Sequence, residues 1–131
     1  MTPRLKLTFT VLPDTLAICR LDGSAPLPGW AFKGPLSSVT RTRDELSIVC
    51  ADDQVPHGLS CQRGWRAIKV SGPLDFELTG VLASLAEPLA EAGISTFAIA
   101  TYDTDYVLVR EERLESSIGA LTAAGHKLSP V

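Results

Sequence analysis

Two apolar runs in the second half of the chain constrain the fold more than any other feature of the sequence. Residues 96–100 (TFAIA) and 106–110 (YVLVR) are rich in β-branched and aromatic side chains, which is typical of buried strands. The polar segment between them, residues 101–105 (TYDTD), can form a tight turn. We therefore predict a hairpin whose two strands are both central in a sheet.

Helical periodicity flanks this hairpin on both sides. Apolar residues recur at helical spacing over residues 79–91 and again over residues 114–121. Gly93 and Gly125 follow these stretches, at the position where helices usually end. Pro88 lies inside the first stretch and removes one intrahelical donor, so we expect a kink or a local loosening there.

A strand at each end completes the pattern. Residues 65–71 (WRAIKVS) alternate apolar and basic side chains before Gly72-Pro73, and residues 127–129 can form a last short strand. The second half therefore reads as a βαββαβ unit. Residues 52–64 hold turn formers with little periodicity, which is typical of a joint. We predict an α+β fold with two domains, residues 1–62 and residues 63–131.

The first half of the chain is predicted to be poor in helix. Residues 6–11 and 15–21 look like one hairpin, and residues 37–43 and 45–51 look like another, with its polar first strand at a sheet edge. Prolines and glycines in residues 25–35 leave room for one helical turn at most.

A weak internal echo relates the two halves. Residues 39–49 align with residues 99–109 at an offset of 60, and residues 6–11 align with residues 66–71. We interpret the chain as two copies of one plan, of which the first has lost most of its helices.

Charge and hydropathy exclude several classes of partner. The chain has 131 residues, a net charge of -3 and 21% charged side chains without a basic cluster, so nucleic acid and anionic membrane are not expected partners. No apolar run approaches the roughly 20 residues that span a bilayer, and the N-terminus lacks the apolar region of a signal peptide. A cytoplasmic location is expected.

No residue pattern points to catalysis, a metal or a cofactor. The three cysteines, Cys19, Cys50 and Cys61, lack zinc or redox spacing and are interpreted as reduced thiols. His57 and His126 have no ligand-spaced partners and are expected to face solvent. Nucleophile and phosphate-loop motifs do not occur, so we predict no enzyme activity, no metal site and no cofactor.

Residues 93–95 (GIS), residues 101–112 (TYDTDYVLVREE) and residues 80–90 (GVLASLAEPLA) carry a resemblance to a known family. The sequence resembles the ACT-domain family, which consists of regulatory ligand-binding modules with a ferredoxin-like βαββαβ fold. It is most similar to the tandem ACT group typified by a cytosolic arginine sensor and by small bacterial proteins. The resemblance covers residues 63–128, and residues 1–62 only by overall plan, as a degenerate, helix-poor ACT-like domain.

The resemblance implies a ligand site between two ACT domains. In the tandem group, an amino acid is held by the loop before the first helix and by the strand and turn that follow the helix. Carried over to this chain, the site residues are Thr79, Gly80 and Val81 at the helix start, Thr101, Tyr102 and Asp105 in the turn, and Ser95 and Thr96 from the facing domain. The arginine sensor has an acidic residue where this chain has Leu78, with Glu77 adjacent, so a preference for a cationic side chain is not implied.

The chemistry of these residues suits a zwitterion. Helix N-termini offer free N–H groups and a positive dipole end to a carboxylate, and a carboxylate such as that of Asp105 can receive an ammonium group. Structural roles remain open beside this one. Gly80 can allow close helix packing, Thr79 can be an N-cap, Asp103 and Asp105 can be ordinary turn residues, and Tyr102 can be a partly buried turn anchor.

The functional hypothesis is a homodimeric regulatory sensor that binds an amino acid at an interface between ACT units. Arg41 stands where the second half has Thr101, which suggests that the first half carries a degenerate site. The alternative is a ligand-free interaction or oligomerisation module that regulates an unidentified partner protein. The melting temperature in the presence of amino acids separates the two hypotheses.

Overall fold

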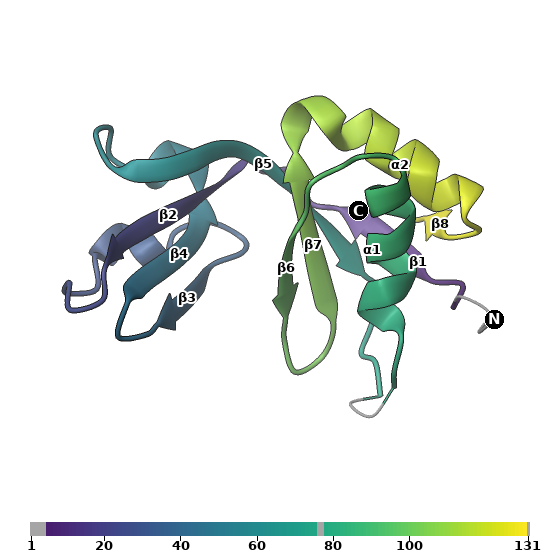
Figure 1. The fold of residues 1–131 in the computed structure, drawn as a ribbon, viewed down its shortest axis with the longest axis horizontal. Helices are drawn as coiled ribbons and strands as arrows, with labels where there is room; N and C mark the ends of the chain where they lie inside the picture. Colours follow the sequence, from purple (N-terminus) through teal and green to yellow (C-terminus); the bar gives the residue numbers. More distant parts are fainter. Residues whose placement is uncertain (1–4, 76–77, 131) are drawn as a thin grey trace. The chain divides into compact units, whose positions relative to one another are not determined.

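The computed structural model describes residues 5–75 and 78–130, and the chain divides into two compact units (Figure 1). The helical unit comprises residues 1–12 and 66–131, and the strand unit comprises residues 13–65. The sequence predicted a single boundary between residues 62 and 63, whereas this division also places residues 1–12 in the helical unit and has its second boundary between residues 65 and 66. The first twelve residues group with the second half of the chain, because the first strand pairs there.

The helical unit contains the βαββαβ order that the sequence predicts. Strand β5 enters it from the strand unit, and a further strand, β1, comes from the N-terminal end of the chain. Its elements are β1 (Thr8–Val11), β5 (Ser60–Val70), α1 (Val81–Glu91), β6 (Phe97–Ala100), β7 (Asp105–Arg110), a 3-10 turn (Glu111–Arg113), α2 (Leu114–Ala123) and β8 (Lys127–Leu128).

The sheet of the helical unit has the strand order β6-β7-β5-β1-β8. Strand β1 runs antiparallel to β5 and parallel to β8, so it lies between the first and last strands of the βαββαβ unit. The prediction that residues 6–11 form a hairpin with residues 15–21 was wrong. The physical reason is burial: Phe9 is fully buried in the core that α1 and α2 cover, together with Ile68 and Val70.

Strand β6 lies at the edge of this sheet, where the sequence predicted a central strand. Among the described residues it pairs only with β7, in the register Phe97↔Leu108 to Ala100↔Asp105. Phe97 and Ile99 are only partly buried, whereas Val107, Leu108 and Val109 on β7 are fully buried. Apolar composition alone therefore did not distinguish an edge strand from its central neighbour.

The core of the helical unit lies between one sheet face and the two helices. Val81, Leu85 and Leu89 project from α1, as their helical spacing predicts, and Leu121 projects from α2. They meet side chains from three strands of the sheet. These are Phe9 on β1, Ile68 and Val70 on β5, and Val107 and Val109 on β7.

The strand unit is built from an antiparallel sheet with the order β3-β4-β2-β5. Strands β2 (Leu16–Asp22), β3 (Ser38–Arg41) and β4 (Glu45–Ala51) pair with the first half of β5, and two 3-10 turns lie at Gly29–Phe32 and Asp52–Gln54. Residues 13–65, all of which the structure describes, contain no α-helix. The predicted hairpin of β3 and β4 and the edge position of polar β3 are both confirmed.

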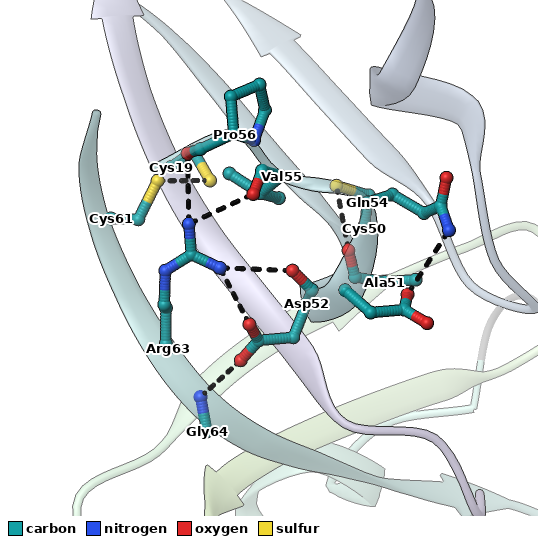
Figure 2. A network of polar contacts seen from close by, with 11 residues as sticks. Cys19, Cys50, Ala51, Asp52, Gln54, Val55, Pro56, Cys61, Arg63 and Gly64 are labelled. Carbon is teal, nitrogen blue, oxygen red and sulfur yellow. Dashed lines mark hydrogen bonds and ion pairs between the residues drawn. The ribbon is translucent and has the colours of Figure 1, made fainter. Parts of the chain in front are cut away.

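A bulge in β5 marks the last residues of the strand unit. The register of β2 against β5 shifts between Leu16 and Ile18, opposite Arg63 and Gly64, and Gly64 has a φ of +75° that glycine adopts without strain. Asp52, in the 3-10 turn that precedes β5, contacts this bulge (Figure 2). Its carboxylate accepts hydrogen bonds from the Arg63 guanidinium at 2.8 Å and from the Gly64 N–H at 2.9 Å.

A histidine outside helix α1 contacts the carbonyl that Pro88 leaves without a helical hydrogen bond. Proline cannot donate to the carbonyl of Ser84, four residues earlier, and His126 Nε2 lies 2.7 Å from that carbonyl oxygen instead. The other ring nitrogen, Nδ1, accepts the Leu7 N–H at 3.1 Å. The prediction that His126 faces solvent was wrong, because these two contacts place it inside the helical unit with only 3% of its surface exposed. His57 is exposed, as predicted.

Candidate functional site

The start of α1 and the turn between β6 and β7 line the same small pocket. Its volume is about 200 Å³, and we call it the turn pocket. Val81 contributes from α1, and Leu74, Asp75 and Leu78 contribute from the segment that precedes the helix. The rest of the lining is Ala100 at the end of β6, residues 101–104 of the turn and Asp105 at the start of β7. Two segments about twenty residues apart in the sequence therefore meet within the helical unit.

The backbone at the N-terminus of α1 has free space beside it. Gly80 is the N-cap residue with φ +83°, and the space around the position of its missing Cβ is empty to 4 Å. The first helical bond joins the Ser84 N–H to the Gly80 carbonyl at 2.9 Å, so the N–H groups of residues 81–83 precede it. Thr79 is exposed and is not the N-cap, so the capping role considered for it was wrong.

The turn between β6 and β7 is held by its own hydrogen bonds. The Thr101 hydroxyl donates to the Thr104 carbonyl at 2.8 Å, and the backbone N–H of Thr101 donates to the same oxygen at 2.9 Å. Thr104 is buried, and its hydroxyl donates to the Val70 carbonyl at 2.8 Å. The Thr101 hydroxyl therefore donates its hydrogen bond within the turn, and the Thr104 hydroxyl joins the turn to β5.

Tyr102 projects from this turn into solvent. Its side chain is 81% exposed, so the expectation of a partly buried anchor was wrong. The chain segment before α1 is tied to the turn by the Leu74 N–H, which donates to the Asp103 carbonyl at 2.7 Å. A Cβ at Gly72 would lie 3.1 Å from the same oxygen, a tight contact, so glycine favours the close approach of the two segments.

Three carboxylates surround the turn pocket and give it a negative lining. Asp103 and Asp105 come from the turn, and Asp75 comes from the segment before α1. Sequence reasoning named the turn residues and missed Asp75, although an acid shortly after Gly72-Pro73 was a visible signal. Glu77, which was considered for a similar role, lies outside the described residues.

A larger pocket of about 460 Å³ shares the turn with the first one. Its lining adds Lys69 from β5, Tyr106 from β7 and the Gly72-Pro73 segment to residues 101–104. We call it the sheet pocket. Neither Lys69 nor Tyr106 was predicted as a site residue, because nothing in their local pattern indicates that β5 and β7 are neighbours.

Ser95 and Thr96 lie apart from both pockets. They are exposed, immediately before β6, and line neither the turn pocket nor the sheet pocket. A role for them at a ligand site requires a second subunit, as the sequence analysis assumed.

Arg41, the counterpart of Thr101 in the strand unit, makes hydrogen bonds within that unit. Its guanidinium donates to the carbonyls of Gly23 and Ala25, the latter at 2.8 Å. These bonds fasten β3 to the loop after β2. They account for an arginine at this position without a ligand.

Residues 5–75 and 78–130, which the structure describes, hold neither a metal-binding cluster nor a membrane-spanning helix. No group of three His, Cys, Asp or Glu side chains there is placed to hold a metal ion. Within the same residues, no helix is long and apolar enough to cross a bilayer.

Comparison with known proteins supports the family and the fold. The family model described as the ACT domain matches residues 60–123, and a second model, described as an N-terminal domain, matches residues 14–58. A crystal structure of a protein from Agobacterium tumefaciens is 38% identical, covers 97% of this chain and 95% of its own, and superposes with a TM-score of 0.91.

Two further relatives carry functional names. The human cytosolic arginine sensor for mTORC1, subunit 1, is 41% identical over 58 residues, which make up 44% of this chain and 18% of the sensor. The match therefore spans less than a fifth of that relative. The regulatory subunit of aspartate kinase from Thermus flavus shares the fold at 16% identity, with a TM-score of 0.64 over 92% of this chain and 99% of its own.

The fold and the family match define a class of regulatory, ligand-binding α+β modules of ferredoxin-like topology. The chain belongs to the ACT-domain family, in the tandem group that includes the cytosolic arginine sensor.

Proposed function

We propose that this chain senses a small amino acid, which binds in the turn pocket of a homodimer. The observation that carries the proposal is that the start of α1 and residues 101–105 line one pocket. The pocket is small, at about 200 Å³, which suits a ligand smaller than a drug-sized molecule.

The two ends of an amino acid match the two sides of this pocket. The α-carboxylate is placed at the start of α1, where the N–H groups of residues 81–83 precede the first helical bond and the helix dipole is positive. The α-ammonium is placed against Asp105, with Asp75 and Asp103 supplying further negative charge. Gly80 leaves space for the ligand to approach the backbone.

The dimer is proposed because Ser95 and Thr96, which the family resemblance assigns to the site, line neither pocket of one chain. Ser95 and Thr96 are exposed and lie immediately before edge strand β6, so a partner placed along this edge brings its own copies towards the turn pocket. Ligand contacts to both subunits then favour the dimer by mass action. We place this sensor in the cytoplasm and assign it no catalytic role.

The second candidate is a protein-interaction module that needs no ligand. It is favoured by the exposure of three apolar or aromatic side chains, Leu78, Leu82 and Tyr102, in the segments that meet at the turn pocket. In that case partner binding is expected to be lost on removing Leu82, and to be unaffected by loss of the Asp105 charge.

Thermal unfolding against the twenty amino acids tests the leading proposal. A ligand at one hundred times its Kd adds about 2.7 kcal/mol, so the melting temperature should rise by several degrees with one or a few amino acids. Asp105→Asn should abolish the rise. Asp44→Asn, which removes an exposed carboxylate from the strand unit, is the matched control and should keep it.

Light scattering with and without that ligand tests the dimer. The dimer fraction should increase with the ligand and fall in Ser95→Trp, whose bulk obstructs the edge. No rise in melting temperature with any amino acid at millimolar concentration would overturn the sensor, and a strictly monomeric ligand-bound chain would overturn the shared site.

A further inference from the structure

Two cysteines face each other on neighbouring strands of the strand unit, and neither lines the turn pocket or the sheet pocket. Cys19 lies on β2 and Cys61 on β5, and the two are direct partners in the antiparallel register (Figure 2). Opposite residues of antiparallel strands have Cα atoms about 4.5–5.5 Å apart, which falls within the range of about 4.4–6.8 Å that a disulfide requires. No backbone movement is needed to join them.

The sulfur atoms are already in contact. Cys61 Sγ lies 2.7 Å from Cys19 Sγ, which is about 0.7 Å longer than a disulfide bond. Both thiols are free in this structure. Their side chains therefore need only a small rotation to form the bond.

The two thiols differ in access to solvent. Cys61 is partly exposed, whereas Cys19 is almost fully buried. Burial raises the pKa of the Cys19 thiol well above its usual range, with contributions from the neighbouring Cys61. The guanidinium of Arg63 interacts electrostatically with both thiols and is paired with the Asp52 carboxylate at 2.8 Å, so solvent exposure is what distinguishes the two thiols. Cys61 is therefore the thiol that meets an oxidant first.

We propose that Cys19 and Cys61 form an oxidative modification site, at which a hydroperoxide converts the two thiols into a reversible intramolecular disulfide. The Cys61 thiolate attacks the terminal peroxide oxygen, the O–O bond breaks, and a sulfenic acid and one water form when the oxidant is hydrogen peroxide. Cys19 sulfur then attacks the Cys61 sulfur and releases its own proton. The sulfenic oxygen leaves as a second water, so two thiols are oxidised and one peroxide is reduced to two waters.

Cys50 provides a contrast within the same unit. It is fully buried on β4, its thiol donates to the Ala51 carbonyl, and burial raises its pKa to about 11. It pairs across the sheet with Ala17 rather than with a cysteine. Cys50 should remain a thiol under the conditions that join the other two.

The modification has a mechanical consequence for the strand unit. The bond would join residues 42 positions apart, so it restricts the unfolded chain and holds the first half of β5 against β2. The oxidised chain should unfold at a higher temperature than the reduced chain. Reduction by a dithiol should return the original melting temperature.

Treatment of the full chain with hydrogen peroxide, followed by intact mass, thiol titration and peptide mapping, tests the proposal. The reactive thiols should fall from three to one, the mass should decrease by two hydrogens, and one mapped peptide pair should link Cys19 to Cys61. Cys50→Ala should form the same link, and its reactive thiols should fall from two to none. Cys61→Ser should lose both the link and the oxidation-dependent rise in melting temperature.

Three outcomes would overturn the proposal. They are oxygen addition at Cys61 without a link, a link that contains Cys50, and a link between two chains. Because Cys61 is partly exposed, Cys61→Ser should fold, and its unchanged melting temperature in the reduced state checks this. None of these readouts involves the turn pocket, so they are independent of the amino-acid test.

Discussion

At the scale of single residues, His126 shows how one side chain compensates for another. Pro88 leaves the Ser84 carbonyl without its helical donor, and His126 Nε2–H occupies that place at 2.7 Å. Its Nδ1 accepts from Leu7 at 3.1 Å, so the neutral tautomer with the proton on Nε2 satisfies both contacts. One buried imidazole thereby connects α1 to the segment that leads into β1.

Replacing this histidine should be costly. His126→Ala leaves the part-buried N–H of Leu7 and the buried carbonyl of Ser84 without these partners, at about 1–3 kcal/mol each, so we expect a loss of about 2–6 kcal/mol in the free energy of unfolding. Chemical denaturation measures this loss. His57→Ala, at an exposed histidine, is the control and should change stability by less than about 0.5 kcal/mol.

A double-mutant cycle separates the helical contact from general packing. Pro88→Ala restores an N–H that can bond to the Ser84 carbonyl, so His126→Ala should be less costly in that background by about 1 kcal/mol. Equal costs of His126→Ala in both backgrounds would show that His126 does not serve as the substitute donor.

At the scale of elements, the two α-helices of the helical unit offer a matched pair of glycines. Gly80 begins α1 with φ +83°, a backbone conformation that other residues adopt at a cost. Gly119 lies inside α2 and is exposed, and no positive φ occurs there. An added Cβ meets no atom within 4 Å at either position, so only backbone conformation distinguishes them.

The same substitution should therefore have opposite effects at the two sites. Gly80→Ala is expected to destabilise the chain by about 1 kcal/mol because of strain, and Gly119→Ala to stabilise it by about 0.5–1 kcal/mol because alanine favours helix. Thermal or urea unfolding measures both. A stabilising Gly80→Ala would mean that α1 does not begin at this left-handed residue in solution.

At the scale of the whole molecule, the N-terminal strand β1 belongs to the helical unit, although residues 13–65 separate it in sequence from the rest of that unit. Strand β1 lies between β5 and β8 and contributes Phe9, which is fully buried, to the core under α1 and α2. The ACT-domain match covers residues 60–123 and does not include this strand. The matched segment alone therefore lacks an internal strand of its sheet.

A fragment of residues 60–131 should not fold cooperatively by itself. Without β1, the edges of β5 and β8 lose their shared partner, and the buried site of Phe9 is open. A synthetic peptide of residues 5–12, added in trans, should restore a cooperative transition in circular dichroism. The same peptide with Phe9→Asp should not, and full cooperativity of the fragment alone would contradict the assignment of β1.

The candidate site was partly predictable. The family resemblance indicated Val81, Thr101, Tyr102 and Asp105, and all four line the turn pocket. It did not indicate Asp75, Lys69 or Tyr106, which reach the two pockets because of the strand order and the path of the chain before α1. Thr79 and Gly80 are adjacent to the pocket in sequence but do not line it.

Local patterns in the sequence were sufficient for the order of strands and helices and for the helix-poor first half, because periodicity reports which side of an element is apolar. The family was indicated by the resemblance of residues 80–90, 93–95 and 101–112. They did not reveal which element covers that side. The pairing of β1 with β5 and β8, the burial of His126 and the contact of Cys19 with Cys61 all join residues more than 40 positions apart. Such contacts depend on how the assembled chain buries its apolar surface. Several distant segments contribute to that surface, and the local sequence of each segment does not indicate which other segment it contacts.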